Sequence, residues 1–315
     1  MSTNRSLGTG QAEPVRPSAP SGVLCMGRVY CDLVFSGLER LPTLGTEVFA
    51  DELSLHGGGG AWITATWLAG LGRATSICAM LPASPFGTLL RADAERCGLD
   101  LSDCRQAEDG EPQLTVALVA QGDRAFLTRR PGAALPPQLH ADALCRPGLT
   151  HLHISELATL LEYPQLPALA RRAGLTVSLD CGWDEAALQR DDLAVHLQLV
   201  DVFMPNEAEF AALPNEALSH LPLLVLKRGR GGASARLRDA AGERWVRMPT
   251  GPLEPMDTTG AGDAFNAGFL HTWLATRSLD QALQSGNRCG ALAVMQRGGG
   301  CHRTIPTDPE HAPAG

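Results

Sequence analysis

The sequence predicts an α/β fold, with a three-layer α/β/α core, a mostly parallel central sheet and a small β-sheet lid. Short apolar runs alternate with helical patterns along most of the chain. Two stretches, 32–56 and 112–131, carry strand patterns with no helix between them. Alternating β and α units are typical of a parallel sheet covered by helices, and the two β-only insertions predict the lid.

The first third of the chain supplies strands and two helices. GVLCMGRV (22–29) is an apolar run ending in a turn and predicts a buried first strand. Residues 32–60 alternate loosely at period two and predict exposed strands. Helical spacing over 61–72, closed by Gly72, predicts a helix, and a buried strand at 74–81 with its own helix follows.

The rest of the chain continues this alternation. QLTVALVAQGDRAFLTRRPGA (113–133) predicts a hairpin, and the strands LTHLHIS, LTVSLDCG, LVDVFMPN and LPLLVLKRG follow before long helices beyond residue 262. We therefore expect a disordered tail at 1–21, one domain at 22–308 with the lid inserted in it, and a short tail at 309–315.

Composition excludes several classes of protein. The 315 residues carry a net charge of −8, which argues against a nucleic-acid partner. Nine cysteines at irregular spacing indicate reduced thiols rather than disulfides or a zinc site. No apolar run approaches the roughly 18 residues of a membrane span, and the first residues lack the apolar core of a signal peptide, so we expect a cytoplasmic protein with no membrane partner.

The segment MDTTGAGDAFNAGFL (256–270) carries the strongest chemical signal. Its two glycines allow a tight turn directly before a helix, and the amides of such a turn, with the positive end of the helix dipole, form an anion site. A carboxylate there, Asp263, suits a general base beside a transferred anion; a helix cap is the alternative. The chain lacks GxxxxGK[ST], and Phe265 breaks GxGxxG, which argues against an NAD-dependent enzyme.

Four segments together resemble the ribokinase (PfkB) family of carbohydrate and nucleoside kinases. The segment DTTGAGD resembles that family's C-terminal signature, and GGGAWITATWLAGLG (58–72) is similar to its N-terminal glycine signature. MPNEAEF (204–210) contains its Asn-x-x-Glu element, and VLKRGRGGA (225–233) resembles its nucleotide-loop strand. They follow the family's order and cover about residues 22–308.

The resemblance implies a catalytic centre and a metal site. Asp263 would take the proton from a sugar hydroxyl, and the amides of the turn would cradle the phosphoryl group. These amides belong to Gly260, Ala261 and Gly262. Asn206 and Glu209 would hold Mg²⁺, Glu209 through water; a helix cap with a first-turn acid is the alternative.

The resemblance also implies a site for ATP. Lys227, Gly229 and Gly232 fall in the nucleotide loop, and Asn287 lies on the helix that lines the adenine pocket in the family. Many members have Thr where this chain has Lys227, whose amine would either touch a phosphate or be solvated. The segment MQRGGG (295–300) is similar to part of the family's monovalent-cation loop, which points to K⁺ as a further cofactor.

On the sugar side, Asp32, Gly58 and Gly59 match the family's pattern. The chain departs from that pattern at Ile63 and Ala134, where relatives usually place asparagine. Apolar groups at these places would leave substrate hydroxyls without partners, so we expect a changed sugar preference and poor use of ribose and fructose.

The sequence thus predicts an ATP-dependent carbohydrate kinase acting on a sugar or sugar-like substrate. A nucleoside kinase of the same family and a non-catalytic sugar- and nucleotide-binding regulator are the alternatives. An exposed lid sheet predicts a possible homodimer through the lid.

Overall fold

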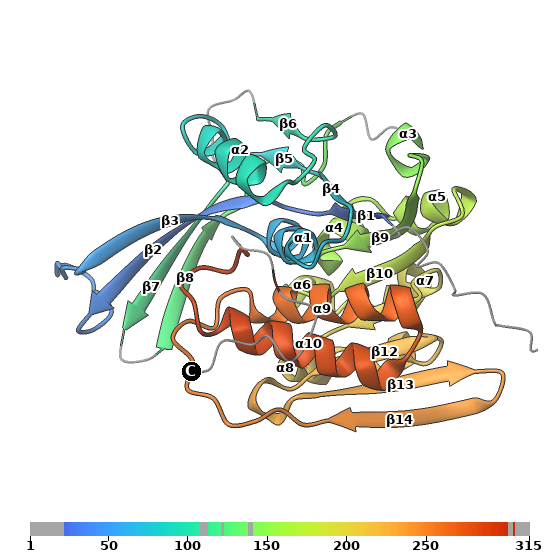
Figure 1. The fold of residues 1–315 in the computed structure, drawn as a ribbon. Coiled ribbons are helices and arrows are strands. Elements are labelled where there is room, and N and C mark those ends of the chain that lie inside the picture. Colours follow the sequence, from blue (N-terminus) through green and yellow to red (C-terminus); the bar gives the residue numbers. More distant parts are fainter. Residues whose placement is uncertain (1–21, 108–112, 121–122, 138–140, 302–304, 306–315) are drawn as a thin grey trace, which may run out of the picture.

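The computed structural model describes residues 22–107, 113–120, 123–137, 141–301 and Ile305. The predicted tails at 1–21 and 309–315 lie outside these residues. In the described part a large sheet is covered by helices on both faces, and a smaller sheet projects from one side (Figure 1). This architecture confirms the predicted α/β class with its mostly parallel sheet and small additional sheet.

The large sheet has eight strands in the order β14-β13-β12-β11-β10-β9-β1-β4. The strands from β4 to β12 in this order run parallel, and β13 and β14 are antiparallel. Their bounds are β1 (Gly22–Met26), β4 (Thr75–Cys78), β9 (Leu149–Ile154), β10 (Thr176–Asp180), β11 (Val202–Met204), β12 (Leu223–Lys227), β13 (Ala233–Asp239) and β14 (Gly242–Met248). The β13–β14 hairpin was not among the predicted strands.

Helices form two layers because residues on each strand alternate between two cores. Val23 and Cys25 face one core, while Leu24 and Met26 face the other. The first core packs against α1 (Gly60–Gly70), α2 (Phe86–Cys97), α9 (Ala261–Thr276) and α10 (Leu279–Ala293). The second packs against α3 (Ala141–Leu144), α4 (Leu157–Glu162), α5 (Leu166–Arg172), α6 (Glu185–Leu188) and α7 (Leu193–Leu197), and the 3₁₀ turn η1 (Asn215–Leu218) also contributes.

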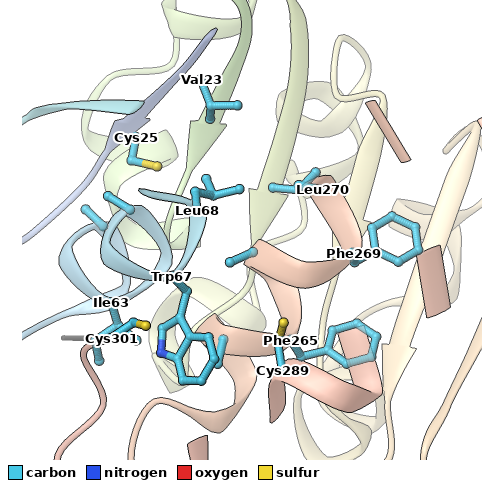
Figure 2. Close-up of a cluster of buried hydrophobic side chains, with 14 of the residues drawn as sticks. Val23, Cys25, Ile63, Trp67, Leu68, Phe265, Phe269, Leu270, Cys289 and Cys301 are labelled. Carbon is cyan, nitrogen blue, oxygen red and sulfur yellow. The ribbon is translucent and has the colours of Figure 1, made fainter. Parts of the chain in front are cut away.

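Figure 2 shows the first core, where α1 and α9 meet. Leu68 of α1 lies opposite Leu270 of α9, whereas Phe265 and Phe269 point from α9 away from α1, and all four side chains are buried. Burying aromatic and branched side chains stabilises the fold by roughly 1.5–3 kcal/mol for each one. This packing holds the start of α9 against the rest of the chain.

The smaller sheet has the order β3-β2-β7-β8. Its strands are β2 (Tyr30–Leu38), β3 (Glu52–Gly58), β7 (Leu114–Ala120) and β8 (Asp123–Arg129), and β5 (Met80–Leu81) pairs with β6 (Arg105–Gln106) elsewhere. The four strands come from the two β-only stretches recognised in the sequence. No described helix is both long enough and apolar enough to cross a membrane.

Candidate active site

A cavity of about 840 Å³ opens where β10, β11 and β12 end and α9 begins. Ligand sites in open α/β sheets lie at the carboxyl ends of the strands. Most of the residues that the sequence singled out contribute to the cavity wall. They are Asn206, Glu209, Lys227, Gly229, Gly232, Ala261, Gly262, Asp263 and Asn287.

The glycine turn has the geometry that the sequence predicted. Gly260 adopts a left-handed φ of 69° at the N-terminus of α9, a conformation that glycine takes without a steric penalty. A Cβ there would also lie 2.7 Å from the Cα of Gly299. Glycine is therefore required twice, for its backbone angle and for the close approach. The amides of a first helical turn have no acceptor within the helix, so they suit an anion; in this structure the Ala261 amide makes a long hydrogen bond of 3.4 Å to the Thr258 carbonyl, which an anion would replace.

Asp263 lies in the first turn of α9 with its carboxylate directed at the cavity. A Cβ on Gly60 would lie 2.9 Å from the Ser155 carbonyl oxygen and 3.1 Å from Asp263 Oδ1, so glycine at this position leaves room for the carboxylate. Burial, with repulsion from Asp180, raises the pKa of Asp263 to about 7, and Lys227 opposes the shift. A carboxylate with a pKa near neutrality is suited to accept a proton at physiological pH.

A buried ion pair lies behind this turn. Lys227 Nζ is 2.7 Å from Asp180 Oδ1 and 3.3 Å from Asn266 Oδ1, and Asn266 Nδ2 donates to Asp180 Oδ2 at 2.6 Å. Lys227 is therefore not solvated, which removes one of the two roles considered for it. Sequence reasoning missed Asp180 and Asn266. The available signal for Asp180 was its place as a charged residue at the end of the apolar run LTVSLD, just as Lys227 ends the apolar run LLVLK.

Asn206 and Glu209 form a capping box on α8 (Glu207–Ala212). Asn206 Oδ1 accepts from the Glu209 amide at 2.9 Å, and Glu209 Oε2 accepts from the Asn206 amide at 2.8 Å. The capping alternative is thus present in the structure, and both side chains also line the cavity. Among the described residues, no three His, Cys, Asp or Glu side chains form a cluster able to hold a metal ion.

The donor set still fits a hydrated Mg²⁺. This ion prefers oxygen ligands, keeps several waters and is often held by only one or two carboxylates. Burial and repulsion from Asp180 raise the pKa of Glu209, and a cation in the cavity would relieve both effects.

The predicted nucleotide residues gather at one end of the cavity. Gly232 has a φ of 80°, and a side chain there would collide with the Met248 carbonyl. Gly229, in the short turn η2 (Gly229–Gly231), also has a positive φ, of 51°. Asn287 Nδ2 donates to the Met248 carbonyl at 3.0 Å, which ties α10 to the end of β14 beside the cavity.

The predicted sugar residues Asp32, Gly58 and Gly59 are not part of the cavity wall, but the next residue along the chain, Gly60, is. Asp32, on β2, is buried, and burial is the main reason why its pKa is raised to about 7. Its carboxylate packs directly against Gly58, where any side chain would overlap it. Gly59 has a φ of 87°, and a Cβ there would collide with the Arg28 carbonyl. These glycines let β3 pass close to the carboxylate.

Ile63 and Ala134 do not line the cavity. Ile63 is 4% exposed and packs against Gly260 and Gly299, and Figure 2 shows it beside Cys301. Ala134 is fully buried in the core on the opposite face of the large sheet. Ile63 thus supports the glycine turn from behind, and a substrate wall at these positions stays a prediction.

The segment 295–300 also lies at the turn. Asp257 Oδ2 accepts from the Gly298 amide at 3.0 Å, and its Oδ1 accepts from the Thr259 amide at 2.8 Å. Asp257 thus joins the start of the DTTGAGD motif to the segment predicted to bind a monovalent cation. His151 and His153, two residues apart on β9, are buried and hydrogen-bonded to Ser178.

An α/β core with a glycine turn, a helix N-terminus and a carboxylate at one cavity fits an enzyme that transfers a phosphoryl group to a hydroxyl. Comparison with known sequences gives the family. A profile of the pfkB family carbohydrate kinases matches residues 22–306. The chain belongs to this family and is a sugar or nucleoside kinase.

Characterised relatives support the assignment. The chain is 30% identical over 304 residues to an ATP-dependent ribose-1-phosphate kinase of Halopiger xanaduensis, covering 90% of this chain and 95% of that protein. It is 27% identical to the fructoselysine 6-kinase of Escherichia coli, over 83% of this chain and 99% of that one. The fold is similar to that of an Arabidopsis thaliana ribokinase solved with ribose and ATP, with a TM-score of 0.72, 21% identity and coverage of 89% and 94%.

Proposed function

We propose that the protein transfers the γ-phosphoryl group of ATP to a hydroxyl of a sugar or sugar-like substrate, with Asp263 as the general base. The observation that carries the proposal is the placement of this carboxylate, in the first turn of α9 and at the wall of the cavity. Its raised pKa means that, near pH 7, it exchanges a proton readily with a hydroxyl beside it.

The turn formed by Gly260, Ala261 and Gly262 would act as the anion hole. Negative charge builds on the transferred phosphoryl oxygens, and preformed amides at a helix N-terminus stabilise it without reorganisation. Phosphoryl transfer depends mainly on positioning and electrostatics, which the rigid start of α9 provides. Asp32 would accept hydrogen bonds from sugar hydroxyls on the other side of Asp263.

Asn206 and Glu209 would hold Mg²⁺ through its water shell, and the metal would neutralise charge on the phosphates. Gly229, Gly232, Lys227 and Asn287 would surround the nucleotide. K⁺ near residues 295–300 remains part of the proposal as a second cation. The small sheet would close over the sugar as a lid and exclude water from the phosphoryl group.

The first substrate to test is ribose 1-phosphate, because the relative that acts on it by name covers nearly the whole chain. We would measure ADP release with ATP and Mg²⁺ over ribose 1-phosphate, ribose, fructose, fructoselysine, 2-keto-3-deoxy sugar acids and nucleosides. A sugar or sugar phosphate should raise ADP release far above the rate with ATP alone, and Asp263→Asn should abolish the increase. A preference for nucleosides would support the alternative nucleoside kinase. ADP release that no compound accelerates would support the non-catalytic regulator.

We further propose a homodimer through the small sheet. Strand register places apolar side chains from all four strands on one face, namely Leu53, Leu55, Leu33, Phe35, Val116, Leu118, Ala125 and Leu127. Of these, Leu127 is 73% exposed and Leu53 is 52% exposed. The same register places Arg129 at one end of this face, opposite Leu114, and the apolar remainder can meet a second copy of itself across a two-fold axis.

A further inference from the structure

We propose that Lys227 is a positioning residue for phosphoryl transfer: clamped between Asp180 and Asn266, it holds a fixed positive charge behind the Gly262 turn and beside Asp263. This inference rests on the proposed kinase function. It adds a charged group, and the two residues that orient it, to the amides and the base already described.

Lys227 is the only lysine in the chain; the other 25 basic residues are arginines. The one site with lysine is also the one where a compact charge is needed. An ammonium is a point charge on a flexible stem, whereas a guanidinium is a planar fork that needs space for five donors. The side chain of Lys227 is 11% exposed and that of Asp180 is 9% exposed, which leaves little room for the larger group.

The sheet brings the members of this cluster together. Val225 and Lys227 are two residues apart on β12 and face the α9 side of the sheet, as Val225 in the first core shows. Asp180 ends β10, and Asn266 lies one turn into α9 with a fully buried side chain. A Cβ on Gly262 would lie 3.4 Å from Lys227 Nζ, so the ammonium lies directly behind the proposed anion hole.

From this position the ammonium of Lys227 has two electrostatic effects. It attracts the negative charge that builds on the phosphoryl group in front of Gly262, and it favours the ionised form of Asp263. The charged groups that act on Asp263 come from several elements: Asp180 on β10, Lys227 on β12, Glu209 on α8 and Asp32 on β2. Lys227 is the cation in this set. Asp180 and Asn266 hold it in place, since a lysine without such partners would move.

Burial alone would lower the pKa of Lys227, but the carboxylates of Asp180 and Glu209 outweigh burial and raise it. The ammonium therefore stays charged throughout the pH range in which Asp263 titrates. The effects of Lys227 and Asp180 on Asp263 can therefore be separated by mutation. Removing Lys227 leaves the negative charge of Asp180 near Asp263, and removing Asp180 leaves the positive charge of Lys227.

The test compares Lys227→Met, Asp180→Asn and the double variant, with kcat/KM measured against pH on the best substrate of the screen. The acidic limb of this pH profile reports the ionisation of Asp263. Lys227→Met leaves Asp180 without its cation, so the limb should move up by about one pH unit. Asp180→Asn leaves Lys227 unpaired, so the limb should move down. The double variant should return the limb towards the wild-type position while kcat stays at least about tenfold low, because the cation is still missing.

Arg228→Met is the matched control. It removes a positive charge from the adjacent residue, whose side chain pairs with Glu207 at the surface. Its acidic limb and kcat should match those of the wild type. If Lys227→Met does not fold, the other two variants still test the proposal: the limb should move down in Asp180→Asn and return towards the wild-type position in the double variant.

A second readout does not depend on turnover. Protein grown with ¹⁵N-lysine gives a single side-chain ammonium signal, which needs no assignment because the chain has one lysine. Adding the non-hydrolysable analogue AMP-PCP with Mg²⁺ should shift this signal in the wild type. A Lys227 signal that does not respond to AMP-PCP would overturn the proposal. So would variants whose acidic limbs all coincide with that of the wild type and whose kcat falls only as far as their thermal stability falls. Absence of activity in the wild-type screen would instead count against the kinase function itself.

Discussion

Asp263 places a carboxylate where burial disfavours its ionised form, so ionising it in the fold lowers the free energy of unfolding. Its pKa rises from 3.8 in the unfolded chain to about 7 in the fold, so the folded state binds more protons between these values. Stability should therefore decrease as pH rises from about 4 to 7, and the loss should be complete above pH 7.

Asp263→Asn should remove this penalty. We expect the variant to melt above the wild type at pH 8, where the wild-type carboxylate is ionised in the fold, and to match it near pH 4, where that carboxyl is protonated. Melting temperatures across this pH range check the prediction. A difference that is the same at both ends would show that the carboxylate is not held at a raised pKa.

Ile63 has a structural task at the same turn. Asparagine there would lose apolar burial against Gly260 and Gly299 and place an amide among apolar neighbours, where an unpaired polar group costs about 1–3 kcal/mol. We expect Ile63→Asn to lower stability in chemical denaturation and activity on every substrate alike. Ile63→Val, a loss of one methylene, should cost only about 0.5–1.5 kcal/mol. A stable Ile63→Asn with a new sugar preference would restore the interpretation of this residue as a substrate wall.

At the scale of the element, helix α8 combines a structural and a chemical role in the same two residues. Glutamine is as good as glutamate at the third position of a capping box, so Glu209→Gln preserves the bond to the Asn206 amide. It removes only the negative charge. We therefore expect unchanged thermal stability and a several-fold rise in the Mg²⁺ concentration needed for half-maximal rate. An unchanged Mg²⁺ titration would locate the metal elsewhere in the cavity.

The strands show how far local pattern carries the prediction. The parallel strands β9 to β12 were predictable because each is a short apolar run between helical patterns. The hairpin β13–β14 was missed although Arg236 and Arg238 alternate with inward residues in the usual period of two. That signal is weaker, since arginine-rich alternation is also typical of an exposed loop.

The site divides in the same way. The glycine turn and Asp263 form one contiguous motif, so the sequence alone predicted them. Asp180 and Asn266 are 86 positions apart and meet only because β10 ends beside α9. The packing of Ile63 against Gly260 and Gly299 was not predicted, because a motif gives the position of a residue along a helix but not the neighbour that its side chain meets.

At the scale of the whole molecule, the small sheet presents its apolar face away from the site. We expect Leu127→Glu to convert a dimer into a monomer in size-exclusion chromatography with light scattering, because it places a charge on the most exposed apolar side chain of the proposed interface, on the edge strand β8. Phe126→Glu is the matched control: Phe126 is next in sequence and 52% exposed, but it lies on the opposite face of β8. A wild-type protein that is monomeric at micromolar concentration would contradict the dimer.

The central claim is that Asp263 is the base for transfer to a sugar hydroxyl, and the most direct measurement is the kcat of Asp263→Asn on the best substrate, together with its affinity for ATP. General-base catalysis is worth about 10²–10⁴-fold, so kcat should fall by that factor while ATP binding by calorimetry stays near the wild-type value. A variant that keeps more than about a tenth of wild-type turnover would contradict the account, since 10² is the smallest loss expected of a general base.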